Sequence, residues 1–149
     1  MKKYKIGYTQ GTFDLFHIGH LNLINNAKML CDYLIVGVND DELVMSYKNK
    51  IPNVNVNNRA KIVSSIKGVD EVIITKTLNK SEIYKKVKFD AIFIGDDWKG
   101  NERWKKTEEE LKLLGTDVIY LPHTDGISTT DLTKKIKGVN DEKNKSFTD

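Results

Sequence analysis

The chain has 149 residues, of which 39% are hydrophobic and 30% charged, and its formal net charge is +3. These values are typical of one soluble globular domain, and the small, evenly spread charge excludes a dedicated nucleic-acid surface. There is no apolar run of membrane-spanning length and no signal-peptide core after Met1. The single cysteine, Cys31, suits a small buried side chain in a reducing compartment, so we expect a cytoplasmic protein.

The hydrophobic pattern of the first half predicts strands and helices in alternation: a strand at 6–9, a helix at 18–30, a strand at 33–38, a short helix at 39–45, a helix at 59–66 and a strand at 69–74. Asn39 or Asp40 is expected to cap the helix at 39–45, and Asn57 or Asn58 the helix at 59–66. Residues 47–58 are polar and rich in asparagine, which predicts an exposed, mobile loop.

The second half continues the alternation: a helix at 81–87 capped by Ser81, a strand at 89–95, a loop at 96–100, a helix at 101–114 that ends at Gly115, a strand at 117–121 and a last helix at 130–136. Five strands interleaved with helices predict an α/β fold with a single doubly wound parallel five-stranded sheet. We expect one catalytic domain at 1–137 and a polar, disordered tail at 138–149.

A strand, a glycine turn and a helix meet at residues 9–20, and His17 and His20 stand at the helix entrance. Such a turn presents backbone N–H groups and the positive end of a helix to an anion. Taken alone, it is equally compatible with a phosphate site and with a chance arrangement. However, the polar loops at 39–41, 95–98 and 123–126 also follow strand ends, so all four segments converge on one edge of the sheet. That convergence favours a phosphate site.

Three motifs together resemble the cytidylyltransferase family, and most closely its bacterial glycerol-3-phosphate members. They are Gly11-Thr12-Phe13-Asp14 with His17-Ile18-Gly19-His20, then Gly95-Asp96-Asp97-Trp98, then Thr124-Asp125-Gly126-Ile127-Ser128-Thr129-Thr130. The resemblance covers residues 4–136. It implies a Rossmann-like nucleotidyltransferase fold and the transfer of CMP from CTP to an alcohol phosphate, with release of pyrophosphate. It also implies Mg²⁺ as cofactor and a homodimer.

The resemblance further implies roles for individual residues. The catalytic residues would be His17, His20, Lys48 and Arg59. The nucleotide would be bound by Thr12, Phe13, Asp14, Gly19, Lys50, Asp96, His123, Thr124, Gly126, Ile127, Ser128, Thr129 and Thr130. The acceptor would be bound by Asp41, Lys67, Asp70 and Trp98, and Asp14 is also a candidate Mg²⁺ ligand. The two histidines would donate hydrogen bonds to oxygens that gain charge as the α-phosphorus is attacked in line.

Two positions depart from the family pattern, because His123 and Lys67 stand where the family has arginine. Histidine cannot make the arginine fork, so either the triphosphate is held less tightly or a nearby lysine substitutes. The identity of the acceptor therefore stays open. Glycerol-3-phosphate comes first, and phosphoethanolamine, phosphocholine or a polyol phosphate are alternatives. A cationic acceptor would need an aromatic or acidic cage, which residues 96–98 could supply. An adenylyltransferase and an inactive nucleotide-binding module complete the alternatives.

Overall fold

The computed structural model of the chain describes residues 2–124 and 127–137. In these ranges the strands are β1 (Tyr4–Gly11), β2 (Cys31–Asn39), β3 (Glu71–Thr75), β4 (Ala91–Gly95) and β5 (Asp117–Leu121). The helices are α1 (Ile18–Leu30), α2 (Asp41–Lys48), α3 (Val56–Ser64), α4 (Lys80–Val87), the short 3₁₀ helix η1 (Asp96–Trp98), α5 (Glu102–Leu113) and α6 (Thr129–Lys137). The disorder predicted for 138–149 concerns positions outside the described residues.

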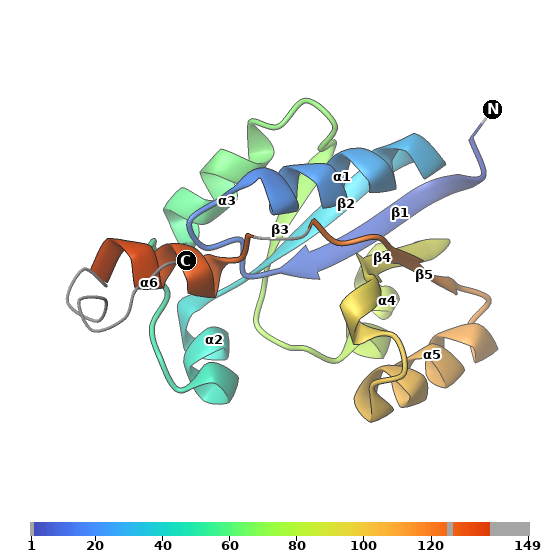
Figure 1. Cartoon of the computed structure of the whole chain (residues 1–149). Coiled ribbons are helices and arrows are strands. Elements are labelled where there is room, and N and C mark those ends of the chain that lie inside the picture. Colours follow the sequence, from blue (N-terminus) through green and yellow to red (C-terminus); the bar gives the residue numbers. More distant parts are fainter. Residues whose placement is uncertain (1, 125–126, 138–149) are drawn as a thin grey trace.

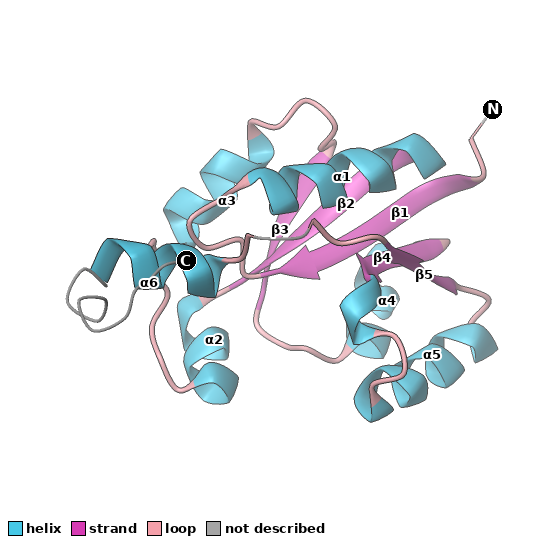
Figure 2. Cartoon of the chain, in the orientation of Figure 1, coloured by secondary structure: helices cyan, strands magenta, loops and turns pink. Residues whose placement is uncertain are grey.

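The five strands form one parallel sheet in the order β3-β2-β1-β4-β5, which confirms the predicted doubly wound α/β fold. Helices α1 and α3 cover one face of the sheet, and α4 and α5 cover the other (Figure 1, Figure 2). The chain leaves β1 toward β2 and later crosses to β4, so the strand order reverses beside β1. In sheets of this kind the crevice at the reversal is where ligands bind.

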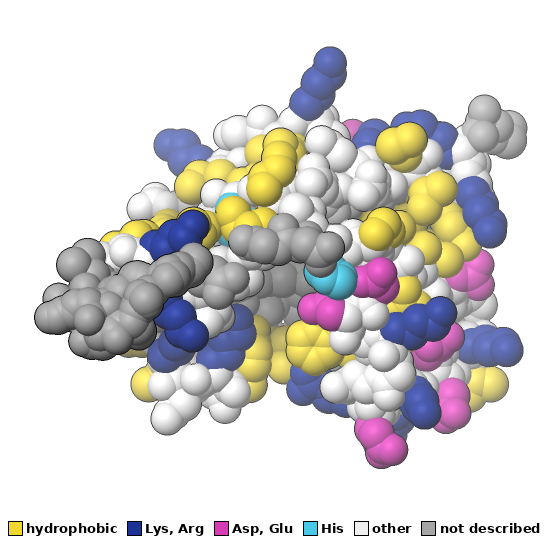
Figure 3. Space-filling view, in the orientation of Figure 1, with side chains coloured by type: hydrophobic (Ala, Val, Ile, Leu, Met, Phe, Trp, Pro, Cys, Tyr) yellow, Lys and Arg dark blue, Asp and Glu magenta, His cyan; other side chains and the backbone are white. Residues whose placement is uncertain are grey.

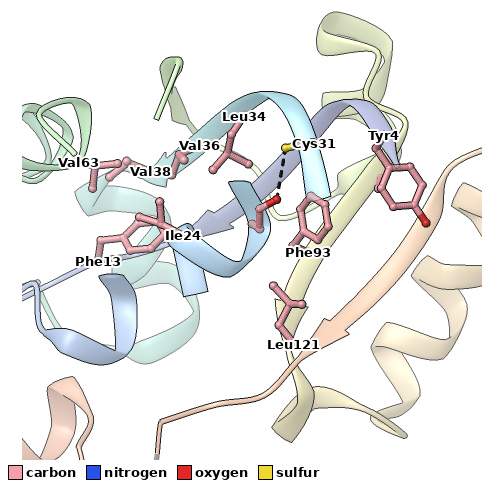
Figure 4. Close-up of a cluster of buried hydrophobic side chains, with 12 residues drawn as sticks. Tyr4, Phe13, Ile24, Cys31, Leu34, Val36, Val38, Val63, Phe93 and Leu121 are labelled. Atoms are coloured by element: carbon pink, nitrogen blue, oxygen red, sulfur yellow. Dashed lines mark hydrogen bonds between the residues drawn. The ribbon is translucent and has the colours of Figure 1, made fainter. Parts of the chain in front are cut away.

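Strand β2 carries apolar side chains on both faces, as its continuous hydrophobic run predicted. Leu34, Val36 and Val38 pack under α1 and α3 (Figure 4). Ile35 points into the second cluster, under α4 and α5. Cys31 is fully buried and its Sγ donates to the carbonyl oxygen of Ala27 at 3.4 Å, which confirms its interpretation as a small buried side chain (Figure 4). Within the described ranges, no helix has the length and apolar character needed to cross a bilayer.

Two helices begin earlier than their hydrophobic pattern indicated. Asn55 caps α3, accepting from the backbone N–H of Asn58 at 3.0 Å, so the predicted caps Asn57 and Asn58 lie inside the helix. Asn79 caps α4 in place of Ser81. Helix α4 opens with three polar residues, and in α3 a single apolar residue, Val56, precedes the polar residues 57–59, so apolar periodicity does not mark either start.

The Tyr8 side chain of β1 lies against Gly37 of the neighbouring strand β2, where only a glycine leaves room for it. It is fully buried, stacks on Phe89 with ring centroids 4.9 Å apart, and donates from Oη to Gln10 Oε1 at 2.6 Å. Burial raises the pKa of Tyr8 far above its ordinary value, so the hydroxyl stays neutral. A Cβ at Gly37 would lie 2.1 Å from Tyr8 Oη, which no folded structure tolerates. Gly37 therefore makes room for a buried donor next to the carboxyl edge.

We expect Gly37→Ala to lower the free energy of unfolding by about 2 kcal/mol, because the new methyl group forces the Tyr8 hydroxyl out of its place. Urea denaturation measures the change. Gly68→Ala is the matched control, since its Cβ would come no nearer than 3.3 Å to any side chain, at Lys28 Cβ, and 3.8 Å to Asn25 Oδ1. Adding Tyr8→Phe to Gly37→Ala should recover part of the loss. Equal stability of the two alanine variants would contradict this account.

Candidate active site

A cavity of about 430 Å³ opens at the carboxyl edge of the sheet. Its origin is a splay between strands: β1 pairs with β4 only at Gly7 and Tyr8, whereas its pairing with β2 continues to Gly11. The walls come from the turn after β1, the end of α2, the start of α4, η1, and the first turns of α5 and α6. Figure 3 shows this face hollowed near its centre, with basic side chains gathered over α2 and α6.

The two histidines form a reciprocal cap at the start of α1. His17 is the N-cap residue, and its Nδ1 accepts from the backbone N–H of Gly19 at 3.0 Å. His20 Nδ1 accepts from the backbone N–H of His17 at 3.2 Å, and the rings stack with centroids 3.8 Å apart. Because each Nδ1 is an acceptor, the proton of each neutral ring lies on Nε2. Each imidazole is thus oriented and presents one N–H donor.

Both imidazoles are neutral near pH 7. Burial lowers the pKa of His17. Burial, with help from His17 and Lys48, lowers the pKa of His20 to about 3, against a smaller opposing effect of Asp14. A Cβ at Gly19 would lie 2.9 Å from His17 Cε1, so the glycine of this motif makes room for the folded-back ring. These side chains are suited to donating hydrogen bonds rather than to releasing protons.

The turn before α1 holds two non-glycine residues in the left-handed region, Phe13 with φ 55° and Leu15 with φ 49°. Each such residue costs about 1 kcal/mol or more, so the surroundings must hold the turn in place. Phe13 is buried and meets the His20 ring edge-on, with centroids 5.3 Å apart. Phe13 therefore supports the histidine ring by packing, and because it also lines the cavity, its predicted contact with the nucleotide stays a prediction.

Asp14 connects this turn to two other segments. Its carboxylate accepts from Asn53 N at 2.8 Å, from Asn53 Nδ2 at 3.0 Å and from Val54 N at 2.9 Å. Its backbone carbonyl accepts from Thr129 Oγ1 at 2.7 Å, and Asn53 Nδ2 also donates to Thr133 Oγ1 at 3.1 Å. The turn, the loop after α2 and helix α6 are thereby joined.

The predicted role of Asp14 as an Mg²⁺ ligand does not fit this geometry. Its oxygens already face three N–H donors, and these donors would repel a cation. Among residues 2–124 and 127–137, no group of three His, Cys, Asp or Glu side chains is arranged to hold a metal ion.

Arg59 does not contact the cavity, which corrects its predicted catalytic role. The side chain is 1% exposed. Nε donates to the carbonyl oxygen of Val54 at 2.7 Å, and Nη1 donates to those of Thr12 at 2.7 Å and Asn39 at 2.8 Å. Nη2 pairs with Asp41 Oδ1 at 2.6 Å, so Asp41 is also a structural partner rather than an acceptor ligand. Arg59 thus joins the turn after β1, the end of β2 and the loop before α3.

Lys48 and Lys50 both line the cavity. The loop predicted at 47–58 is shorter, at 49–55, because α2 continues to Lys48 and α3 starts early. Tyr47 Oη lies 3.1 Å from Thr12 Oγ1 and accepts from Asn39 Nδ2 at 3.2 Å, which anchors the end of α2 beside Lys48. Two ammonium groups therefore border the same cavity as His20. The predicted contact of both lysines with phosphate stays a prediction.

Helix α6 starts at the cavity, which Thr129 and Thr130 line. The carbonyl oxygen of Ser128 accepts from Leu132 N at 3.0 Å, so Ser128 stands at the helix entrance as predicted. Ile127 lies beside Gly19, because a Cβ there would be 3.7 Å from Ile127 Cγ2. The helix entrance thus lies beside the cap of α1.

The segment before α6 is tied to neighbouring elements. Thr124 Oγ1 accepts from Asn22 Nδ2 of α1 at 2.9 Å. His123 Nδ1 and Asp96 Oδ1 are 2.7 Å apart, and this hydrogen bond holds the pKa of Asp96 below its usual range. The histidine at the arginine position is therefore bound to a carboxylate from η1. Trp98, also in η1, lines the cavity with 41% of its surface exposed. Gly126 lies outside the described residues.

Lys67 and Asp70 are not brought to this site. Asp70 Oδ2 accepts from Leu34 N at 2.8 Å and from Lys28 Nζ at 2.6 Å, and it precedes β3. Both residues therefore stand at the amino ends of the strands, at the edge of the sheet opposite the cavity. Their predicted contact with the acceptor is wrong for this chain, because a parallel strand separates its two ends by its full length.

Helices α4 and α5 form a second cationic wall of the cavity that no sequence motif predicted. Lys80, 9% exposed, donates to the carbonyl oxygen of Leu78 at 2.8 Å, and its Nζ lies 5.2 Å from the centroid of the Trp104 ring. Burial and the neighbouring guanidinium of Arg103 lower the pKa of Lys80 to about 8. All three side chains line the cavity. The available signal was Arg103 itself, one of only two arginines among 24 basic residues.

Comparisons with known proteins agree with this geometry. The family model described as cytidylyltransferase-like matches residues 8–135. A glycerol-3-phosphate cytidylyltransferase of Bacillus spizizenii is 45% identical over 85% of this chain and 92% of its own length. That of Bacillus subtilis is 38% identical, covering 88% of this chain and 96% of its own. The solved structure of a lipopolysaccharide core biosynthesis protein from Thermoplasma volcanium has a TM-score of 0.72 at 27% identity, covering 82% of this chain and 99% of that one.

We expect Arg59→Met to lower the free energy of unfolding by about 3–5 kcal/mol, because it leaves Asp41 and three carbonyl groups without their donor. Urea denaturation with circular dichroism measures the loss. Lys61→Gln, an exposed change on the same helix, is the control and should change stability by less than about 0.5 kcal/mol. Unchanged stability with weakened nucleotide binding would instead restore the phosphate-binding role of Arg59.

The His20 ring should stay neutral from about pH 8 down to about pH 5, since its lowered pKa of about 3 means that it gains a proton only in strong acid. The imidazole resonances of His20 in an NMR titration should therefore not move in that range. His20→Asn assigns the signal by removing it. A titration midpoint near the ordinary value of about 6.5 would contradict the buried, amide-bound ring.

Proposed function

The chain belongs to the cytidylyltransferase-like family, and from this premise we propose that it transfers CMP from CTP to glycerol-3-phosphate, giving CDP-glycerol and pyrophosphate. It is a nucleotidyltransferase. The observation that carries the proposal is the stacked pair of His17 and His20, which presents two Nε2–H donors from the start of α1. Two lysines and the start of α6 border the cavity that His20 lines.

The reaction needs positioning and charge stabilisation more than covalent chemistry, because a phosphate oxygen of the acceptor is already an ionised nucleophile. That oxygen attacks the α-phosphorus of CTP in line. The bond from the α-phosphorus to the bridging oxygen breaks, and pyrophosphate leaves with the electron pair. No proton has to be removed, which agrees with neutral imidazoles whose pKa values are lowered.

Each group at the cavity has a distinct part in this scheme. The Nε2–H groups of His17 and His20 donate to oxygens of the α-phosphate, where negative charge grows in the transition state. Lys48, Lys50 and the N-terminal end of α6 neutralise the departing β- and γ-phosphates. Since the imidazoles are anchored through Nδ1 to backbone N–H groups, they need no reorientation as the charge develops.

Mg²⁺ in this proposal arrives with the triphosphate of CTP, as part of the substrate. This ion usually keeps several waters and binds mainly through phosphate oxygens, and both oxygens of Asp14 already accept hydrogen bonds from N–H groups. The ion would reduce repulsion between the triphosphate and the incoming acceptor. The homodimer and the cytoplasmic location stay predictions.

Pyrophosphate release tests the proposal directly. The protein is incubated with Mg²⁺, one nucleotide (CTP or ATP) and one acceptor (glycerol-3-phosphate, phosphoethanolamine, phosphocholine or a polyol phosphate). We expect turnover with CTP and glycerol-3-phosphate. Turnover with ATP alone would overturn the choice of base. Silence with every acceptor would overturn the enzyme and favour an inactive nucleotide-binding module.

His17→Asn and His20→Asn should each lower kcat by about 100-fold or more, since each removes a donor to the charge that forms in the transition state. Asparagine at position 17 remains a strong N-cap, so the fold should be retained, as thermal unfolding can verify. Asn26→Ala, remote from the cap, serves as the control. A loss below about tenfold at both histidines would refute their role.

A further inference from the structure

The cations that line the cavity fall into two groups on separate elements. Lys48 and Lys50 belong to α2 and the loop after it, and Lys80 and Arg103 belong to α4 and α5. Helices α4 and α5 pack on each other on the face of the sheet opposite α1 (Figure 1). Asp14 is the one acidic residue among the described residues that line the cavity, and its oxygens are already bound by N–H groups. The cavity is therefore built for more than one anionic group.

Lys80 is a cation whose surroundings suit an anionic ligand. It is buried, and among the described residues no carboxylate forms an ion pair with it. Among the described residues its Nζ donates to the carbonyl oxygen of Leu78, although an ammonium group can donate three hydrogen bonds. A buried ammonium beside a second cation, Arg103, is costly, and an anionic ligand at the cavity would offset that cost.

In the wall formed by α4 and α5, the side chain of Lys80 covers the Trp104 ring. Lys80 Nζ lies 5.2 Å from the centroid of the Trp104 ring, in the position that the ammonium group of a choline or ethanolamine ligand would require. Asp96 is less available to bind the ammonium group of an acceptor, because its carboxylate is paired with His123. Lys80 thus takes the place of an ammonium ligand on Trp104. Trp98 also lines the cavity and is exposed, so the rejection of an ammonium group rests on the positive charges of Arg103 and Lys80.

We propose that Arg103 is a specificity-determining residue. With Lys80 seated on Trp104, it forms an acceptor site that takes alcohol phosphates without positive charge and rejects those with an ammonium group. This inference rests on the proposed function, because the acceptor is defined by it. Arg103 acts by direct charge: its guanidinium attracts the acceptor phosphate and repels an ammonium group on the alcohol.

The test compares glycerol-3-phosphate with phosphoethanolamine, which differ in the charge of the alcohol. At saturating CTP, the wild-type kcat/KM for glycerol-3-phosphate should exceed that for phosphoethanolamine by about 100-fold or more, because both carry the phosphate but only phosphoethanolamine brings an ammonium group near Arg103 and Lys80. Arg103→Gln should lower this ratio by about tenfold, because loss of the phosphate contact raises the KM for glycerol-3-phosphate, whereas for phosphoethanolamine that loss is offset by relief of the repulsion. The KM for CTP should stay the same. Arg103→Glu should lower it further, and Arg103→Lys should restore most of it.

Lys105→Gln is the matched control, because it removes one positive charge from an exposed position of the same helix that does not line the cavity. It should leave the ratio unchanged. A ratio that is the same in the wild type, Arg103→Gln and Arg103→Glu would overturn the role of Arg103 while leaving the proposed function intact.

Calorimetric titration of each acceptor alone into the wild type and into Arg103→Gln distinguishes a failure of the proposed function from a failure of the proposed role of Arg103. If no acceptor gives pyrophosphate, the proposed function fails. Tighter binding of glycerol-3-phosphate than of phosphoethanolamine, lost in Arg103→Gln, would still support an anion-selective site. Equal binding of both acceptors would overturn it.

Discussion

The site depends on one buried guanidinium. Arg59 donates to the carbonyl oxygens of Thr12, Asn39 and Val54 and pairs with Asp41, so three segments, at residues 12, 39–41 and 54, are held at one point. A buried arginine is unfavourable unless its donors are satisfied, and the carbonyl groups at strand ends and in loops need donors in turn. The carbonyl groups satisfy the donors of the guanidinium, and the guanidinium supplies the donors that the carbonyl groups need. The turn that carries the histidines rests on this arrangement.

The cavity combines neutral donors with separate cations, and burial produces the difference between them. His17 and His20 lose their charge because they are removed from water and anchored to backbone N–H groups. The cations come from α2 and the loop after it, and from α4 and α5. Neutral donors can lie close to a phosphorus atom without binding the ground-state phosphate too tightly, whereas full charges are suited to phosphates that stay charged throughout.

The positions of the elements followed from the sequence where the signal was local. The limits of α1 and β5 agree with the structure because each coincides with a change in apolar periodicity or with a stop such as Pro122. The starts of α3 and α4 were placed too late, since their first turns hold too few apolar residues to show a period. The roles of Arg59, Asp41, Lys67 and Asp70 were assigned by resemblance to a pattern. The direction of a side chain and the end of a strand on which it stands are not part of such a pattern.

By itself, the sequence determined the fold class, the edge of the sheet where ligands bind, and the pair of histidines at the helix entrance, because alternating apolar segments and a glycine turn are properties of neighbouring residues. Only the tertiary structure decided which ring nitrogen carries the proton, that Arg59 is buried beneath the cavity, and that Lys80, Arg103 and Trp104 border the same space as His20. Those outcomes depend on contacts between residues far apart in the chain, and on the water that packing removes from around each charge.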